Sequence, residues 1–166
     1  MKKAPIVLIM MGSESDLPVM KETADILRAF DVPYEMRISS AHRSPVKTLT
    51  LASEAAGRGI RIIIAGAGMA AHLAGVVASK TILPVIGVPM PGGALGGVDA
   101  LYATVQMPGG IPVATMAIGK AGAKNAGLFA IQILALSETH LAESLSRYRV
   151  EMDKELELKD AALQDQ

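Results

Sequence analysis

Five short apolar runs alternate along the chain with segments of helical pattern. The first run, residues 5–11, is apolar at every position, which is typical of a strand buried on both faces of a sheet. The other runs cover residues 34–39, 60–65, 85–88 and 112–118. Strands of this kind that alternate with helices favour a parallel sheet with helices on both faces.

Helix signals fill the segments between these runs. A helix is expected over residues 17–30, with Asp16 as N-cap and Pro18 in its first turn. Pro45 opens a second helix that ends near Arg58. Further helices are expected at residues 72–80, at 98–105 and over most of the chain from Ala121.

The number of strands predicts which loops meet. Five strands in an open parallel sheet favour the order 2-1-3-4-5, in which the first strand lies between the second and the third. The loops after these three strands, residues 12–16, 40–43 and 66–71, are polar or rich in glycine. Since ligands bind outside the carboxyl ends of the strands where the order reverses, we expect one site built from all three loops.

Length and composition narrow the class of protein. A chain of 166 residues is expected to form a single α/β domain over residues 1–166. Sixteen basic residues balance sixteen acidic ones and aromatic residues make up 3%, which argues against nucleic-acid binding. No stretch has the pattern of a membrane span or a cleaved signal, so a cytoplasmic protein that binds no membrane is expected. The absence of cysteine excludes disulfides and thiolate metal sites.

The apolar content of the chain and its C-terminal segment both bear on whether the protein forms oligomers. Hydrophobic residues make up 51% of the chain, which indicates either apolar surface buried between subunits or an alanine-rich core. From Ser137 on, charged residues are frequent and predict an amphipathic helix at about 138–164. This helix either packs on a neighbouring subunit or extends into solvent. His140 lies in it and is given no role.

The tetrapeptide Ser40-Ala41-His42-Arg43 carries the strongest chemical signal. It joins a hydroxyl, a titratable ring and a permanent cation where a strand ends and a helix begins. A phosphate could bind to the helix N-terminus and Arg43, leaving His42 free to move a proton. The alternative is a helix cap with a solvated arginine and an incidental histidine.

The first loop offers complementary groups. Its backbone N–H groups and the hydroxyls of Ser13 and Ser15 suit a phosphate, and the Asp16 carboxylate suits ribose hydroxyls. Helix capping alone also explains Ser15 or Asp16. The G-x-x-x-x-G-K-[ST] pattern is missing, which argues against hydrolysis of a nucleoside triphosphate.

The third loop is best explained as a floor for a flat ligand. Residues 66–71 loosely match a dinucleotide fingerprint, but they follow the third strand, and no acidic residue exists between Glu54 and Asp99. His72 comes next, either facing the ligand or capping the following helix. The spacing of the three histidines fits no common metal motif, and no G-x-S-x-G elbow is present.

Taken together, these loops resemble the N5-carboxyaminoimidazole ribonucleotide mutase family of purine biosynthesis. The likeness covers roughly residues 5–136 and rests on several motifs in order. These are Gly12-Ser13-x-Ser15-Asp16, Ser40-Ala41-His42-Arg43, Ala65-Gly66-Ala67-Gly68-x-Ala70-Ala71-His72-Leu73, Gly87-Val88-Pro89, Val105-Gln106-Met107-Pro108-x-Gly110-Ile111-Pro112-Val113 and Ala117-Ile118-Gly119-Lys120-Ala121-Gly122-Ala123-x-Asn125-Ala126.

The resemblance implies a flavodoxin-like three-layer αβα fold, a homo-octamer, a small ribonucleotide substrate and no metal or organic cofactor. It makes His42 the general acid and base. The residues expected to bind the substrate are the phosphate ligands Ser13, Ser40 and Arg43 with the nearby Ser15, the ribose ligand Asp16, and Ala67, Gly68, Ala70, His72 and Leu73 around the imidazole and the migrating carboxyl group.

The reaction implied by the resemblance moves a carboxylate from N5 to C4 of an aminoimidazole ribonucleotide. Protonation by His42 would release CO2, a small apolar pocket of Ala70, Ala71 and Leu73 would hold it, and neutral His42 would then remove the C4 proton. One alternative is direct carboxylation with CO2 by a relative of the same family. A more distant alternative is a nucleotide-binding module without catalysis.

The chain departs from the usual family pattern at three places. Met69 replaces a common glycine and Ala74 a common proline, while residues 91–94 lack a serine often found in that loop. The change at Met69 is expected to alter loop flexibility.

Overall fold

The computed structural model describes residues 3–164. The chain divides into two compact units at the boundary between Ala130 and Ile131. The single domain expected over residues 1–166 therefore stays a prediction. The first unit holds β1 (Val7–Met11), η1 (Glu14–Asp16), α1 (Leu17–Ala29), β2 (Tyr34–Ile38), α2 (Pro45–Glu54), η2 (Ala56–Arg58), β3 (Ile62–Ala67), α3 (Leu73–Ala78), β4 (Val85–Pro89), α4 (Val98–Val105), β5 (Ala114–Thr115) and the first part of α5 (Lys120–Ala135).

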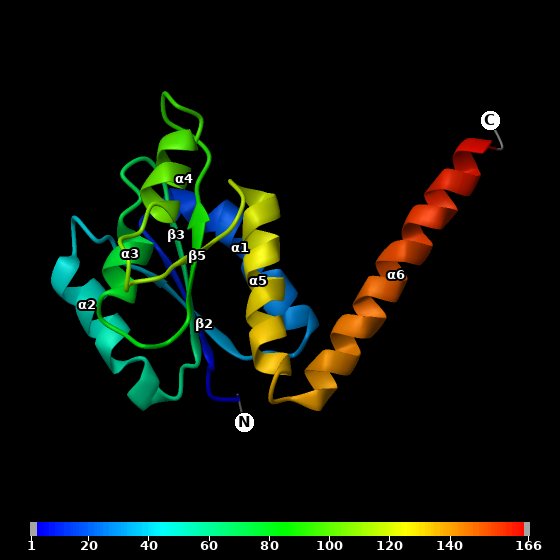
Figure 1. The fold of residues 1–166 in the computed structure, drawn as a ribbon, viewed down its shortest axis with the longest axis horizontal. Coiled ribbons are helices and arrows are strands. Elements are labelled where there is room, and N and C mark those ends of the chain that lie inside the picture. The colour runs from blue at the N-terminus through cyan, green and yellow to red at the C-terminus, as the bar shows by residue number, and fades with distance from the viewer. Residues whose placement is uncertain (1–2, 165–166) are drawn as a thin grey trace. The chain divides into compact units, whose positions relative to one another are not determined.

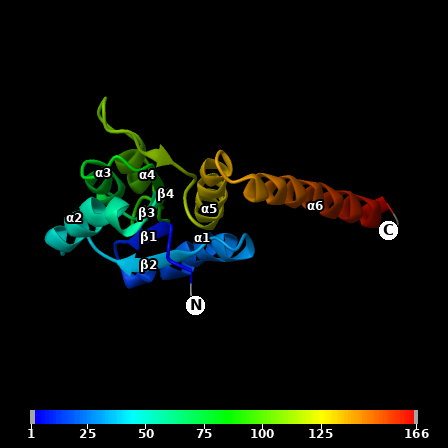
Figure 2. The same ribbon diagram turned by 90° about the horizontal axis from the view of Figure 1, so that it is seen from below.

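The five strands form one parallel sheet in the order β2-β1-β3-β4-β5, as predicted. β1 lies between β2 and β3, with Val7 opposite both Tyr34 and Ile62. Helices α2 and α3 lie on one side of the strands, and α1 with residues 120–130 of α5 lies on the other (Figures 1 and 2). The three-layer flavodoxin-like architecture is confirmed.

The sheet is apolar on both faces because helices cover both. All five residues of β1 are buried, and alternate side chains point to opposite layers. Leu8 and Met10 belong to a core cluster with residues of α2 and α3, including Leu51 and Val77. On the α1 side, Thr23 is fully buried and its hydroxyl donates to the Ala123 carbonyl of α5 at 2.7 Å.

Each strand differs from its predicted extent by a residue or more, and β3 and β5 differ most. β3 begins at Ile62 and runs through Ala67, so Gly66 and Ala67 belong to the strand and not to the loop. β5 has two residues, although the apolar run predicted seven. This run lies at the sheet edge, where β5 pairs with β4 alone, and Pro112 has no N–H to donate.

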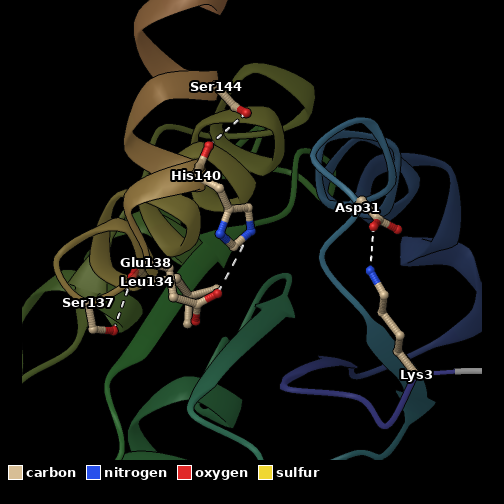
Figure 3. A network of polar contacts seen from close by, with 7 residues as sticks. All are labelled: Lys3, Asp31, Leu134, Ser137, Glu138, His140 and Ser144. Carbon is tan, nitrogen blue, oxygen red and sulfur yellow. Dashed lines mark hydrogen bonds and ion pairs between the residues drawn. The ribbon is translucent and has the colours of Figure 1, made fainter.

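The second unit comprises the last turn of α5 and helix α6 (Thr139–Gln164). Ser137 and Glu138 join the two helices, and the Ser137 hydroxyl donates to the Leu134 carbonyl at 3.2 Å (Figure 3). His140 Nε2 lies 4.0 Å from a Glu138 carboxylate oxygen. Within this unit, side chains between Gln132 and Arg149, among them Leu136 and Leu145, line a groove of about 300 Å³, while every residue from Glu151 to Gln164 is exposed.

Within residues 3–164, no helix combines the length and the apolar character that crossing a membrane requires.

Candidate active site

A cavity of about 590 Å³ opens where β1, β2, β3 and β4 end at their carboxyl termini. The order of the strands brings the following loops together, as the sequence predicted. Of the predicted site residues, those that line the cavity are Ser13, Ser15, Asp16, Ser40, His42, Arg43, Gly68 and Ala70. Gly12 and Met69, from the loops expected at the site, also line it, and the loop after β4, which was not expected there, adds Met90, Pro91, Gly92 and Gly93.

The first loop is held in shape by a reciprocal capping arrangement. The Ser13 hydroxyl accepts the Ser15 N–H at 3.4 Å, and an Asp16 carboxylate oxygen accepts the Ser13 N–H at 3.0 Å. Asp16 stands at the N-cap position of α1 as predicted, but its side chain makes no cap bond to that helix. Asp16 therefore fixes the loop rather than the helix, and it also lines the cavity.

Burial raises the pKa of the Asp16 carboxyl above the ordinary value for an aspartate. Desolvation is the main cause, since the carboxylate loses water at the cavity wall. Hydrogen bonds from the Ser13 and Gly12 backbone and from Ser15, together with the Arg43 charge, oppose this shift. A desolvated carboxylate that is still ionised is a strong acceptor for hydroxyl donors.

Replacing Asp16 by Asn should change how stability depends on pH. Because the folded pKa is raised, the folded wild-type protein binds more protons than the unfolded chain, and its free energy of unfolding falls as pH rises from about 4 through the folded pKa. Asp16→Asn removes this fall, so denaturant titrations between pH 3.5 and 7 should give a flatter profile. Glu14→Gln, in the same turn, controls for the change in net charge. An unchanged profile in Asp16→Asn would contradict the assignment.

The second loop is anchored by buried hydroxyls. Ser39 is 1% exposed, its N–H donates to the Met11 carbonyl at 2.8 Å, and its hydroxyl lies 2.8 Å from that of Thr48 on α2. Beyond it, the Ser40 hydroxyl accepts the Arg43 N–H at 3.2 Å. Helix α2 begins only after Ser44, so Ser40 closes a turn that precedes the helix and is not its cap.

Arg43 links the second loop to the first. Its Nη2 donates to the Gly12 carbonyl at 2.8 Å, which directs the guanidinium along the cavity wall. This bond uses one of five donors, and the planar fork suits a phosphate placed beside it. Arg43 is exposed, and this bond holds its guanidinium at the cavity wall.

His42 and His72 form a hydrogen-bonded pair. His42 Nε2 lies 2.9 Å from His72 Nδ1, and the rings meet edge to face with centroids 5.0 Å apart and an interplanar angle of 83°. A single proton lies between these two nitrogens, so the tautomers of the two neutral rings are coupled: when one of the two nitrogens carries hydrogen, the other accepts it. His72 stands at the N-cap of α3 but makes no cap bond, so the capping alternative for His72 is wrong.

The third and fourth loops supply an apolar wall. It consists of Met69, Ala70, Met90 and Pro91. The Met90 N–H donates to the Ala67 carbonyl at 2.9 Å, which continues the pairing of β3 and β4 beyond the strands. A Cβ at Gly68 would lie 3.2 Å from that of Met90, so glycine allows this close approach.

Four predicted residues do not line the cavity. Ala67 lies within β3, and His72 reaches the site through His42. Leu73 is 2% exposed and belongs to the core cluster, and Ala71 is equally buried. Ala70 alone of the predicted apolar pocket lines the cavity, and the rest of the apolar wall comes from Met69 and from Met90 and Pro91 of the loop after β4.

The described part of the chain, residues 3–164, contains no group of three His, Asp or Glu side chains that could hold a metal ion. A site free of metal and cofactor stays a prediction.

Comparisons with known proteins agree on one family. The family model described as AIR carboxylase matches residues 6–155. The chain is 54% identical over 161 residues to the N5-carboxyaminoimidazole ribonucleotide mutase of Pyrococcus horikoshii, covering 97% of this chain and 90% of that protein. It is 56% identical over 145 residues to the mutase of the same name from Bacillus subtilis, covering 87% of this chain and 90% of that one. The crystal structure of Treponema denticola PurE superposes with a TM-score of 0.86 at 29% identity, covering 96% of this chain and 98% of the other.

Proposed function

Because the chain belongs to the AIR carboxylase family, we propose that it is an N5-carboxyaminoimidazole ribonucleotide mutase of purine biosynthesis. It converts the N5-carboxylated aminoimidazole ribonucleotide to the 4-carboxylated isomer. The observation that carries this proposal at the site is the placement of His42, bonded to His72, beside Arg43 on one cavity wall. A proton-transfer group stands next to an anion-binding group there, as a reaction on a phosphorylated substrate requires.

The polar wall binds the ribonucleotide. The hydroxyls of Ser13 and Ser40 and the guanidinium of Arg43 hold the 5′-phosphate, with Ser15 at the edge of the same loop. The carboxylate of Asp16, desolvated and fixed by the Ser13 N–H, accepts hydrogen bonds from the ribose hydroxyls. The imidazole then lies toward Gly68 and Ala70, where the polar and apolar walls meet.

The reaction needs one group that gives a proton and then takes one back. His42 donates a proton to N5, the bond between N5 and the carboxyl carbon breaks, and CO2 and the neutral aminoimidazole result. C4 attacks the CO2 to form the new carbon–carbon bond, and His42 removes the C4 proton, which restores aromaticity. Atoms and charge balance without a further reactant, and His42 returns to its starting state.

The pairing of the two rings suits this double role. In one tautomer His72 accepts a hydrogen bond from His42 Nε2, and in the other it donates one. His72 therefore accommodates both protonation states of His42 without moving the ring. Ala67 and Leu73 lie behind this wall. Ala67 is part of β3 and Leu73 packs in the core, and both hold the loop between them in position.

The cavity wall retains CO2 between the two steps. CO2 is uncharged and apolar, so it binds weakly to hydroxyls and cations. It can instead pack on the apolar wall of Met69, Ala70, Met90 and Pro91. Holding CO2 beside C4 replaces a bimolecular capture, an orientation effect worth roughly 7 kcal/mol or more in ideal cases.

Incubation with the N5-carboxylated ribonucleotide and identification of the product tests this function. We expect the 4-carboxylated isomer at a rate that does not change with added bicarbonate. The second candidate, direct carboxylation, is favoured by the description of the family model as AIR carboxylase. That reaction would instead use the uncarboxylated ribonucleotide and depend on bicarbonate. Binding without turnover of either substrate would indicate a non-catalytic module.

The enzyme assembles as a homo-octamer in this proposal. Exposed apolar side chains on α6, among them Leu156, Leu158 and Leu163 at 67%, 72% and 68% exposure, support burial against other subunits. Light scattering should give about eight times the 17.3 kDa of one chain. A monomer mass at micromolar concentration would contradict it.

A further inference from the structure

Met69 adopts a backbone conformation that non-glycine residues rarely take. Its φ is +54°, in the left-handed region, and it lies between Gly68 and Ala70 on the loop that follows β3. Such a conformation costs of order 1–3 kcal/mol and persists where the surroundings hold it. The Ala71 N–H donates to the Met69 carbonyl at 2.8 Å, which stabilises this tight turn.

Burial of the Met69 side chain does not offset that cost in the free protein. The residue is 64% exposed, although methionine is among the residue types most often buried. A strained backbone therefore presents a flexible apolar side chain to solvent at the cavity mouth. The Met69 side chain is therefore available to pack on a bound ligand.

The side chain points toward the opposite loop. A Cβ at Gly93 would lie 3.4 Å from Met69 Cγ, so the thioether passes alongside the backbone of that loop. Gly92 and Gly93 have φ values of +129° and +66°, and both line the cavity. The Met69 side chain thus reaches from the loop after β3 to the loop after β4.

We propose that Met69 is a positioning residue that covers the bound aminoimidazole and retains CO2 beside it. This inference rests on the proposed function. With substrate bound, the thioether packs on the apolar face of the imidazole ring and against Gly93, which excludes water from the region between N5 and C4. The packing offsets the backbone strain only when the ligand is present.

Without the Met69 side chain over the imidazole, CO2 should escape from the cavity more often. Once N5 has taken its proton and the bond from N5 to the carboxyl carbon has broken, CO2 either reacts with C4 or leaves the cavity. Escape yields the uncarboxylated aminoimidazole ribonucleotide and CO2, with His42 deprotonated until it takes a proton from water. The share of turnovers that end this way measures retention directly.

Met69→Ala removes the thioether and keeps a Cβ, whereas Met69→Leu keeps apolar bulk. We expect Met69→Ala to raise the enzyme-dependent share of uncarboxylated product several-fold, after subtraction of the enzyme-free rate, and Met69→Leu to stay close to wild type. Met69→Gly relieves the strain and removes the side chain, so it should leak like Met69→Ala while gaining stability. Asp31→Gly, at the other non-glycine residue with φ +54°, controls for strain relief away from the cavity and should leave the product ratio unchanged.

An unchanged product ratio in Met69→Ala, with wild-type turnover intact, would overturn the role of Met69 and leave the proposed function standing. Absence of any carboxylated product with the wild-type protein would instead count against the function. A second readout then tests the cover alone: saturating uncarboxylated ribonucleotide should slow oxidation of Met69 by peroxide several-fold, and oxidation of Met152 on α6 should not change. Equal oxidation of Met69 with and without the ribonucleotide would overturn the cover.

Discussion

Replacing His42 by Asn should lower turnover of the N5-carboxylated ribonucleotide by about two to four orders of magnitude. Asn keeps a polar side chain of similar reach but cannot donate a proton to N5 and later accept one from C4. Because His42 is exposed and contributes no core packing, the free energy of unfolding should stay near that of wild type. Single-turnover kinetics at saturating substrate, with denaturant titration of the same sample, measure both quantities.

Two further variants make the His42 experiment specific. His140→Asn changes an exposed histidine on α6 and should leave turnover unchanged. His72→Asn removes the partner of the 2.9 Å hydrogen bond but leaves the proton-transfer group, so we expect a smaller loss than in His42→Asn. Near-normal isomerisation by His42→Asn, with the fold intact, would remove His42 from the acid and base role.

Gly122→Ala should destabilise the protein by about 3 kcal/mol, the upper part of the range for overpacking. Gly122 is buried in the first turn of α5, and a Cβ there would overlap the Ala117 carbonyl oxygen and lie 2.6 Å from its carbon. These are backbone atoms, so no side-chain rotation can relieve the overlap. The segment before α5 must move, which disturbs the packing of α5 on α1.

Gly57→Ala is the matched control, since a Cβ there meets nothing within 4 Å. Lowered entropy of the unfolded chain should make this variant equal to wild type or more stable by up to about 1 kcal/mol. Midpoints and slopes of urea unfolding give both free energies. If Gly122→Ala and Gly57→Ala had the same free energy of unfolding, the segment before α5 would have moved without cost, which would contradict the prediction.

The topology was predictable because the strands are buried on both faces. A strand such as β1, without a single polar residue, is compatible with few environments other than the centre of a covered parallel sheet. The short β5 was not predictable from its apolar pattern, because pairing at the edge depends on a single neighbour and on Pro112.

The polar half of the site was predictable, and the apolar half was not. Ser13, Asp16 and Arg43 follow strand ends directly, so strand order alone brings them together. The pairing of His42 with His72 joins positions thirty residues apart and depends on side-chain directions. Likewise, the common family glycine that Met69 replaces is compatible with a positive φ, but the residue type methionine does not predict one.

The bond from the Gly12 N–H to the Gly66 carbonyl has a consequence for how the protein folds. It extends the pairing of β1 with β3, whose residues Val7 and Ile62 are opposite one another but far apart along the chain. During synthesis β1 and β2 exist before β3 does, with an apolar edge exposed to other chains. Arrival of β3 covers that edge and closes the floor of the cavity in the same step. Protection of the β1 edge and the meeting of the first three loops of the site are therefore acquired together, while the wall of Met90 and Pro91 is added only with β4.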